Sequence, residues 1–292
     1  MKVATAAYPI DWHESWQAYA HKLERWVSEA QTGGAELLVF PEYGLMEVAS
    51  LAGDLGGDYQ KQAQAVADRF DEAEALHAEL ARAHGLHILM ASGPAWSGHD
   101  LVNRAALISP TGVSVHQDKQ IMTRWERDPW GIVSGGPLRV FETQLVRIGV
   151  LICYDSEFPL LARRLVEAEV EVILVPSCTE ALEGYWRVRI GAMARALEGQ
   201  CVTVMSSLVG DVPWCEPVEQ NTGMGGVFGP PDMGFPATGV LAEGALNKAG
   251  WTYADVNLEA IRLVRADGHV LNRLHWSEQN GALEKVETCR LP

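Results

Sequence analysis

The sequence has too few basic residues for a typical binder of nucleic acids or anionic membranes. Its 292 residues include 23 Lys and Arg against 38 Asp and Glu, which gives a formal charge of −15 with histidine neutral. Phosphate-rich surfaces attract basic patches and repel an acidic chain. We therefore expect neither nucleic acid nor a membrane among its partners.

Long apolar runs are also missing. No stretch approaches the roughly 20 consecutive apolar residues that a membrane-spanning helix requires. The first apolar run, residues 2–9, is followed at once by Asp11 and Glu14. It is too short for the core of a signal peptide and predicts a first strand instead.

Cysteines are few, and they do not follow a disulfide or zinc pattern. The five are odd in number and widely spaced, and no C-x-x-C pair occurs among Cys153, Cys178, Cys201, Cys215 and Cys289. This argues against a disulfide framework and against a zinc site. The glycine motifs GxGxxG and GxxxxGK[ST] are absent too, so no nucleotide cofactor is implied. The pattern favours a reducing cytoplasm.

What is present is the composition of a globular protein. Hydrophobic residues make up 48% of the chain and charged residues 21%, which is ordinary for a soluble domain and unlike a disordered segment. The length is about that of two average domains, but α/β folds of roughly 250 residues on one core are common. We expect a single domain over residues 1–292.

The first third of the chain alternates between predicted helices and strands. Ser15 is a candidate N-cap for a helix over 16–30, where apolar residues recur three and four positions apart. An apolar burst at 37–40 predicts a strand buried on both faces. A second helix over 70–84 and a strand over 86–91 follow. This alternation of strands and helices predicts an α/β fold.

The rest of the chain adds antiparallel strands to these alternating elements. Apolar runs at 105–108 and 113–116 flank turn residues, which predicts a hairpin. The other predicted elements are strands at 147–153, 170–175 and 201–206, helices at 158–168 and 185–200, and Gly- and Pro-rich loops around a hairpin at 223–239.

Three chemically useful side chains follow predicted strands. Glu42 follows 37–40, Lys119 follows the strand that begins at Val113, and Cys153 closes the apolar run 148–152. Functional groups in α/β folds gather where strands give way to loops. Each residue alone has a plainer interpretation: a small buried hydrophobe for Cys153, a helix N-terminal charge for Glu42 and a solvated surface charge for Lys119.

Together with their neighbours, these residues resemble the three signature blocks of the carbon–nitrogen hydrolase (nitrilase) superfamily, in its amidase-like branch. The blocks are Phe40-Pro41-Glu42-Tyr43-Gly44, then Asp118-Lys119-Gln120 with Glu126 seven residues after the lysine, then Gly149 to Pro159 around Cys153-Tyr154-Asp155. Residues 194–200 also resemble the family's helix that leads into a strand. Three blocks in the family's order, over nearly the whole chain, form a specific signal.

The resemblance implies an α/β fold of the nitrilase type, a four-layer αββα sandwich that usually pairs into dimers. It also implies a catalytic Glu–Lys–Cys triad. Glu42 would be the general base, Lys119 the cationic stabiliser and Cys153 the nucleophile, with Glu126 as a second, positioning carboxylate. The family needs no cofactor, and no metal is expected.

The chemistry of a thiol explains this division of roles. A free thiol has a pKa near about 8.5 and needs a neighbouring base or cation to react at neutral pH. We expect Glu42 to take the proton and Lys119 to favour the thiolate. The Lys119 ammonium and the backbone N–H of Tyr154 are the expected donors to the oxyanion. A plainer interpretation of Glu126 is a surface acid paired with a nearby arginine.

The residues that would select the substrate are less well defined. The family often has Arg before Phe-Pro and Glu after it, whereas this chain has Glu157 and Leu160, and Glu198-Gly199 stands where Glu-Asn is common. The pocket candidates Tyr43, Trp130, Cys178 and Thr179 could face substrate or could only pack and anchor loops. Arg187 and Arg189 could hold a substrate carboxylate or form structural salt bridges.

The predicted function is hydrolysis of a non-peptide C–N bond in a small linear amide or N-carbamoyl amine, through a thioester on Cys153. A nitrilase acting on a C≡N group, a soluble acyltransferase and a catalytically silent binding protein are the alternatives. A Cys–His hydrolase is disfavoured because none of the nine histidines lies in a Cys-protease-like block. We expect a cytoplasmic homodimer or higher homo-oligomer with the helix 158–168 at its interface.

Overall fold

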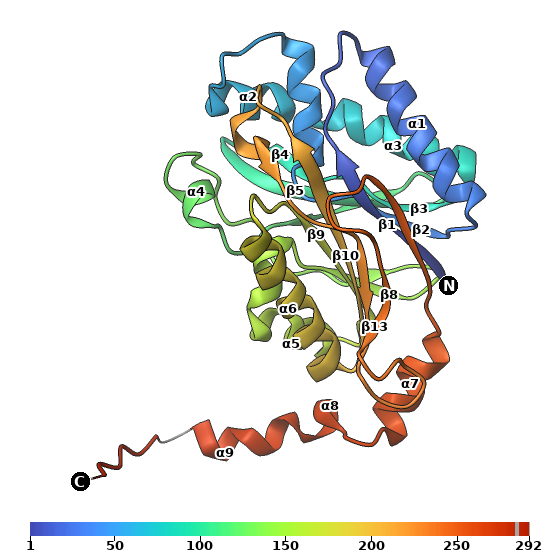
Figure 1. The fold of residues 1–292 in the computed structure, drawn as a ribbon, viewed down its shortest axis with the longest axis vertical. Coiled ribbons are helices and arrows are strands. Elements are labelled where there is room, and N and C mark those ends of the chain that lie inside the picture. Colours follow the sequence, from blue (N-terminus) through green and yellow to red (C-terminus); the bar gives the residue numbers. More distant parts are fainter. Residues whose placement is uncertain (284–285, 292) are drawn as a thin grey trace.

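The structure, a computed structural model, describes residues 1–283 and 286–291. Within these residues, 14 strands join into one curled sheet with helices on its outer faces (Figure 1). The curled sheet forms two layers. The first contains β1 (Lys2–Pro9), β2 (Leu37–Val39), β3 (His87–Leu89), β4 (Gly93–Ser97), β5 (Asp100–Ile108), β6 (Ser114–Asp118) and β14 (Gly250–Asp255). The second contains β7 (Phe141–Glu142), β8 (Arg147–Val150), β9 (Val172–Ser177), β10 (Val202–Asp211), β11 (Gln220–Asn221), β12 (Gly226–Phe228) and β13 (Val240–Glu243).

Strand β1 joins the two layers. Residues 2–7 of β1 pair with β14 in antiparallel register, whereas residues 7–9 pair with residues 207–209 of β10 in parallel register. Both partners lie on the edge of β1 opposite β2. Because β10 and β14 share that edge, the layers diverge there and one lies over the other.

Helices cover the outer face of each layer. On the first layer lie α1 (Trp16–Thr32) and α3 (Phe70–His84), and alternate residues of β1 such as Ala4, Ala6 and Tyr8 belong to the core beneath them. The opposite face of this layer packs on the second layer, whose core continues to α5 (Pro159–Glu167) and α6 (Leu182–Gly199). The predicted αββα arrangement is confirmed.

Most predicted elements lie where the sequence indicates. The Ser15 side chain accepts a hydrogen bond from the N–H of Ala18, α3 ends at Gly85 in the left-handed conformation, and β5 and β6 form the predicted hairpin. Several elements were not predicted, and η1 (Gly44–Ala52) and α2 (Tyr59–Ala67) are the two that lie between the predicted strand at 37–40 and helix at 70–84. Residues 44–50 are all buried, so η1 has no polar face to produce a helical period.

Short elements complete the fold. They are α4 (Arg124–Arg127), η2 (Cys153–Glu157), η3 (Glu216–Val218), α7 (Leu258–Asp267), α8 (Asn272–His275), η4 (Trp276–Gln279) and α9 (Asn280–Leu283). In the part of the chain that the structure describes, no helix has the length and apolar character to cross a membrane.

Two sharp turns follow strands β2 and β8. Tyr43 and Cys153 have φ values of 56° and 49°, left-handed conformations that residues with a side chain rarely adopt. Such a conformation costs on the order of 1–3 kcal/mol, so the surroundings must hold it. At Cys153 the support is α6, which approaches η2 closely because Gly191 has no side chain. A Cβ there would lie 3.0 Å from the backbone oxygen of Ser156.

A buried charge cluster holds the turn after β2. Glu47 of η1 is fully buried and forms an ion pair with Lys22 of α1. It also accepts hydrogen bonds from the hydroxyl of Tyr8 at 2.7 Å and from the N–H of Asp11 at 2.8 Å. Because η1 begins two residues after Glu42, this cluster fixes the segment on which Glu42 lies.

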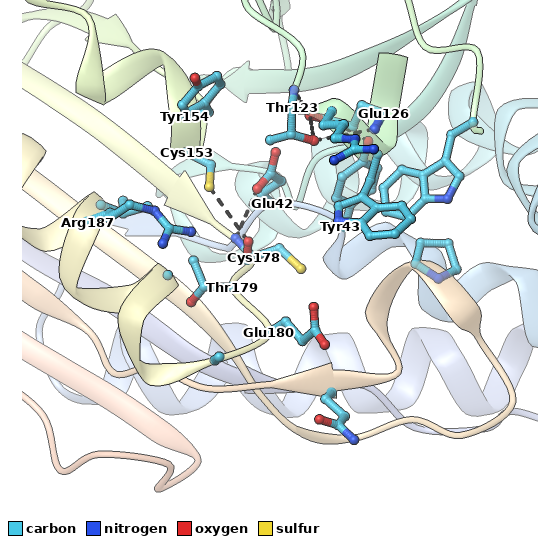
Figure 2. Close-up of a pocket in the computed structure, with 18 of the residues that line it drawn as sticks. Glu42, Tyr43, Thr123, Glu126, Cys153, Tyr154, Cys178, Thr179, Glu180 and Arg187 are labelled. Carbon is cyan, nitrogen blue, oxygen red and sulfur yellow. Dashed lines mark hydrogen bonds between the residues drawn. The ribbon is translucent and has the colours of Figure 1, made fainter. Parts of the chain in front are cut away.

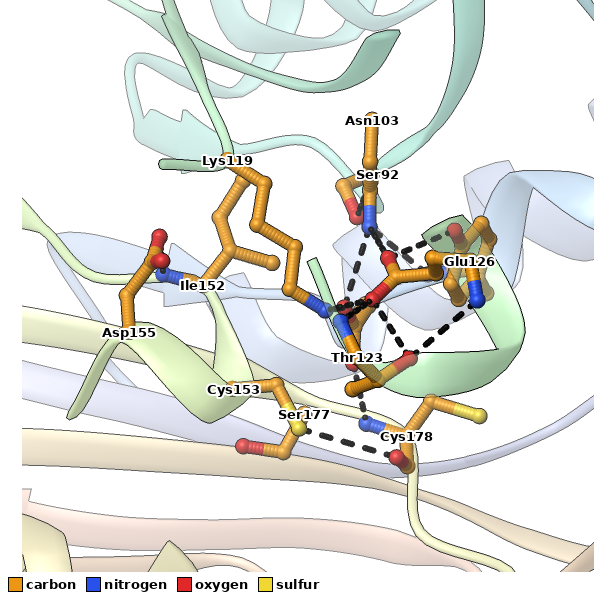
Figure 3. A network of polar contacts seen from close by, with 12 residues as sticks. Ser92, Asn103, Lys119, Thr123, Glu126, Ile152, Cys153, Asp155, Ser177 and Cys178 are labelled. Atoms are coloured by element: carbon orange, nitrogen blue, oxygen red, sulfur yellow. Dashed lines mark hydrogen bonds and ion pairs between the residues drawn. The ribbon is translucent and has the colours of Figure 1, made fainter. Parts of the chain in front are cut away.

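The carboxylate of Asp155 links the turn after β8 to the turn after β6. It accepts hydrogen bonds from the N–H groups of Gln120 at 3.1 Å and Ile121 at 2.8 Å. It also accepts one at 3.3 Å from the N–H of Ile152, which lies beside it in Figure 3. Asp155 is 1% exposed. One buried side chain therefore connects the segment after Lys119 with the segment that begins at Cys153.

Asp155→Asn should destabilise the protein, because the new NH₂ group would face backbone N–H donors. We expect a loss of about 1–3 kcal/mol in unfolding free energy, measured by urea denaturation. Asp267→Asn is the matched control, since Asp267 is exposed on α7 and has no ion pair in the described chain. Wild-type stability in Asp155→Asn would contradict this role for Asp155.

Candidate functional site

The three segments predicted to carry the chemistry meet at one cavity of about 780 Å³ (Figure 2). Glu42 follows β2, Lys119 directly follows β6, and Cys153 is the first residue of η2 after β8. All three line the cavity, as do Glu126 and Tyr154. The parallel strands β2 and β8 both deliver their carboxyl ends to this place, as expected for an α/β fold.

Lys119 lies between two carboxylates at the bottom of the cavity. Its Nζ atom is 2.7 Å from Oε1 of Glu42 and 2.7 Å from Oε2 of Glu126 (Figure 3). Each of the three side chains is only 1% exposed. At this burial an unpaired charge would be very costly, so the ammonium and the carboxylates depend on one another.

Asn103 bridges the same two carboxylates. Its amide nitrogen donates to Oε1 of Glu42 at 3.0 Å and to Oε1 of Glu126 at 3.3 Å, and Ser92 donates to its amide oxygen at 2.7 Å. Neither Asn103 nor Ser92 was predicted. A polar Asn in the interior of the apolar strand β5, with 0% exposure, is the one signal that could have indicated it.

Glu126 is a buried member of the site rather than a surface acid paired with an arginine. Its Oε2 accepts hydrogen bonds from both the N–H and the hydroxyl of Thr123 at 2.9 Å, which forms the capping box of α4. Its Oε1 accepts from the hydroxyl of Tyr43 at 2.8 Å. The short helix α4 therefore orients this carboxylate toward Lys119.

Cys153 faces the carbonyl group of Cys178 across the cavity. The distance from Sγ to that oxygen is 3.6 Å, and the N–H of Cys178 donates to Oε2 of Glu42 at 3.0 Å. The turn after β9 thus contacts both the thiol and the carboxylate. Cys153 is 5% exposed, so only a small part of its side chain opens onto the cavity.

The pKa shifts of the charged cluster follow from burial and from the neighbouring charges. Burial raises the pKa of Glu42, and the charge of Glu126 adds to this, while Lys119 opposes it. Burial also acts to raise the pKa of Glu126, but Lys119 and the hydrogen bonds from Thr123 and Tyr43 hold it below its usual range. Burial would lower the pKa of Lys119, yet the two carboxylates raise it well above normal. The cluster therefore keeps Lys119 charged.

The thiol differs from the expectation that Lys119 would favour its thiolate. Burial raises the pKa of Cys153 well above normal, and the negative charge of Glu42 raises it further, which outweighs the opposing effect of Lys119. The physical reason is that burial disfavours the charged thiolate more than one nearby ammonium can offset. The resting thiol is therefore protonated at neutral pH, with the carboxyl group of Glu42 beside it.

The four pocket candidates all line the cavity, and each also contacts another part of the protein. Tyr43 is bound to Glu126, and the backbone of Cys178 to Glu42. The hydroxyl of Thr179 donates to the backbone of Thr222 at 2.7 Å, and the ring of Trp130 stacks on Tyr59. Thr179 is thus also a loop anchor, and Trp130 also a packing residue.

The two arginines of α6 have different surroundings. Arg189 is buried, donates to the hydroxyl of Tyr185 at 2.9 Å and pairs with Glu243 at 2.7 Å, so it forms a structural salt bridge. Arg187 is exposed and lines the cavity (Figure 2). Over residues 1–283 and 286–291, no three His, Cys, Asp or Glu side chains are grouped to hold a metal ion.

Comparisons with known proteins place this geometry in a family. The chain is 31% identical over 270 residues to the probable hydrolase YhcX of Bacillus subtilis, covering 92% of this chain and 52% of that protein. It is 29% identical over 194 residues to nitrilase 3 of Arabidopsis thaliana, covering 62% of this chain and 54% of that protein. The chain spans about half the length of these curated relatives.

A solved structure shares the fold. It is a variant of the amidase from Nesterenkonia sp. AN1 with acrylamide added at its active-site cysteine, and it matches with a TM-score of 0.66 at 21% identity, covering 95% of this chain and 99% of that one. In addition, the family model for carbon–nitrogen hydrolases matches residues 2–266. The protein therefore belongs to the carbon–nitrogen hydrolase family.

Proposed function

We propose that the protein hydrolyses a non-peptide C–N bond in a small linear amide or N-carbamoyl amine, through a thioester on Cys153. The observation that carries the proposal is the buried Glu42–Lys119–Glu126 cluster, which lies in the same cavity as the thiol. It supplies a carboxylate base and a fixed positive charge beside a nucleophile. These are the parts that acyl transfer requires.

In the first step the thiol sulfur adds to the carbonyl carbon. The ionised form of Glu42 takes the thiol proton as the C–S bond forms. Negative charge develops on the carbonyl oxygen, and the Lys119 ammonium and the backbone N–H of Tyr154 stabilise it. A preorganised donor of this kind contributes about 3–4 kcal/mol to lowering the barrier.

In the second step the C–N bond breaks and the thioester remains. Protonated Glu42 gives its proton to the leaving nitrogen, which departs as ammonia or an amine. Glu42, again ionised, then takes a proton from water as the water oxygen adds to the thioester carbon. Collapse of that intermediate breaks the C–S bond, returns the proton to sulfur and releases the carboxylic acid, or a carbamic acid when the substrate is a carbamoyl amine.

Glu126 acts as a positioning residue in this scheme. It touches Lys119 and Tyr43 and not the thiol, so its effects reach the reaction through the ammonium and through the pKa of Glu42. Two carboxylates around one ammonium also prevent Lys119 from giving up its proton.

A nitrilase is the second candidate, because the same thiol could add to a C≡N carbon and the relatives include a nitrilase. A soluble acyltransferase would use the same thioester with an amine in place of water. A catalytically silent binding protein would not need a charged cluster next to a thiol. Burying those charges is costly, which argues against this alternative.

Glu126→Gln should shift the pH profile of kcat/KM toward acidic pH. Glu42 must be ionised to accept the thiol proton, so kcat/KM falls as the pH drops through its pKa. The negative charge of Glu126 raises that pKa, and its removal should move the acidic limb to lower pH. The plateau value of kcat/KM should fall about ten- to hundredfold, because the variant loses a hydrogen bond between charged groups.

The matched control for that profile is Glu79→Gln, because Glu79 is an exposed residue of α3 with no ion pair in the part of the chain that the structure describes. It should reproduce the wild-type profile. An acidic limb that stays in place or moves to higher pH in Glu126→Gln would contradict the proposed coupling of the two carboxylates.

Wild-type protein incubated with hexanamide should carry an acyl adduct in intact-protein mass spectrometry, and Cys153→Ala should carry none. The adduct forms because the sulfur replaces the leaving nitrogen on the carbonyl carbon. Ammonia release from hexanamide and from hexanenitrile then separates the two candidates. Faster release from the nitrile would favour a nitrilase, and an adduct on Cys153→Ala would rule out this nucleophile.

We also propose that two copies pair through α5 and α6 in a reducing cytoplasm, where the free cysteines of the described chain would stay reduced. These helices expose large apolar side chains, including Leu160 at 69% and Ile190 at 62%. Large exposed apolar side chains are candidates for contacts with a second copy. Because α6 packs on η2, pairing would also steady the turn at Cys153.

Ile190→Glu should convert a dimer to a monomer at micromolar concentration, since it buries a charge in the proposed interface. Light scattering after size exclusion measures this. Leu263→Glu on α7, exposed but outside the interface, is the control and should stay dimeric. A wild-type protein that is monomeric and fully active would overturn the proposal.

A further inference from the structure

The wall of the catalytic cavity carries an excess of negative charge. Five glutamates line it besides Glu42 and Glu126, and they are Glu157, Glu180, Glu183, Glu216 and Glu219. No hydrogen bond or ion pair joins any of these five carboxylates to another residue in the described chain. Carboxylates that bind no part of the protein remain available to a ligand.

The positive charges of the wall do not balance these acids. Within the described residues, Arg124 and Arg187 are the arginines that line the cavity, and the ammonium of Lys119 is already held between two carboxylates. Arg187 lies close enough to lower the pKa of Glu157, against the larger effect of burial, which raises it.

The acids reach the cavity from separate parts of the fold. Glu157 ends η2, Glu180 and Glu183 lie at the start of α6, and Glu216 and Glu219 belong to η3 and the residue after it. Figure 2 shows Glu180 in the wall below Cys178. A cleft lined from several sides by one sign of charge focuses its field on the space between and attracts the opposite charge.

Glu157 is the acid of this set that lies nearest to Cys153 in the sequence. It is the last residue of η2, the short helix that begins at Cys153, and it lines the cavity. Its carboxyl group therefore adds to the negative charge that a substrate meets beside the thiol.

Aromatic faces lie in the same wall. Trp125 is 62% exposed, and Tyr154 also lines the cavity. The face of such a ring attracts a cation, most strongly for tryptophan. An exposed tryptophan in the same wall as unpaired carboxylates favours an organic cation over an inorganic one, since the ring contributes little to a hydrated metal ion.

We propose that this cavity selects amides or N-carbamoyl amines that carry a positive charge, as an ammonium or guanidinium group, several bonds from the reacting carbonyl. This proposal rests on the proposed function, because the site is the catalytic cavity itself. The glutamates of its wall would select among the substrates that enter it. A volume of about 780 Å³ is far larger than a simple amide needs, so there is room for a chain that ends in a cation.

Three amides of similar length test the selection. Hexanamide is neutral, 5-aminopentanamide is cationic at neutral pH, and glutaric acid monoamide is anionic. We expect kcat/KM to be at least about tenfold higher for the cationic amide than for the neutral one, and lowest for the anionic one. The advantage should shrink as salt is added, because exposed charges are screened.

Charge-removing variants connect the selection to the wall. Glu180→Gln and Glu183→Gln should each lower the cationic-to-neutral ratio of kcat/KM by about threefold, the size expected for one partly exposed charge pair. The double variant should lower it further. Glu79→Gln, which removes the same charge from a surface outside the cavity, should leave the ratio unchanged.

The outcomes separate this proposal from the function on which it rests. Equal kcat/KM for the cationic and neutral amides, or a ratio that the glutamate variants do not change, overturns charge selection and leaves the amidase proposal intact. If wild type turns over none of the three amides, titration calorimetry with Cys153→Ala decides. Tighter binding of the cationic amide supports the selection even then, and equal or absent binding overturns it.

Discussion

The site depends on one arrangement, an ammonium group held between two carboxylates with almost no access to water. Lys119 contacts Glu42 and Glu126 at 2.7 Å each, and neither carboxylate could remain buried and ionised without it. Asn103 ties the two acids together, and the capping box of α4 fixes Glu126. Removing Lys119 would leave two buried carboxylates with no cation beside them, so both acids depend on the ammonium.

This cluster explains how a thiol with a raised pKa could still react. The effect of Lys119, which favours a thiolate, is outweighed in the resting site by burial and by the charge of Glu42, which lies close to the sulfur. Proton transfer to Glu42 and attack by the sulfur would then occur together. Lys119 would exert its full stabilising effect on the oxyanion. Stabilisation that appears only in the transition state is the kind that raises kcat.

The sequence predicted which segments carry the site residues better than it predicted the hydrogen bonds that connect those segments. Glu42, Lys119 and Cys153 were singled out because each follows a predicted strand and lies in a block that resembles the family's. Short apolar runs located β2 and β8, and apolar residues three and four positions apart located the first helices. Asn103 and the link from Asp155 to Ile121 were not predicted, because such contacts join residues far apart in the chain and leave no local period. The net effect on the Cys153 pKa depended on burial and on distances to two opposing charges, which spacing does not give.

The protonation state of the resting thiol can be measured from the thiolate absorbance of Cys153 near 240 nm as a function of pH, taken as the difference between wild type and Cys153→Ser. If Glu42 is the base for a neutral thiol, no thiolate signal should be present at pH 7, and it should appear only at strongly alkaline pH. A full thiolate signal at neutral pH would mean that Lys119 holds a preformed anion, and would contradict the role of Glu42 as the base that takes the thiol proton.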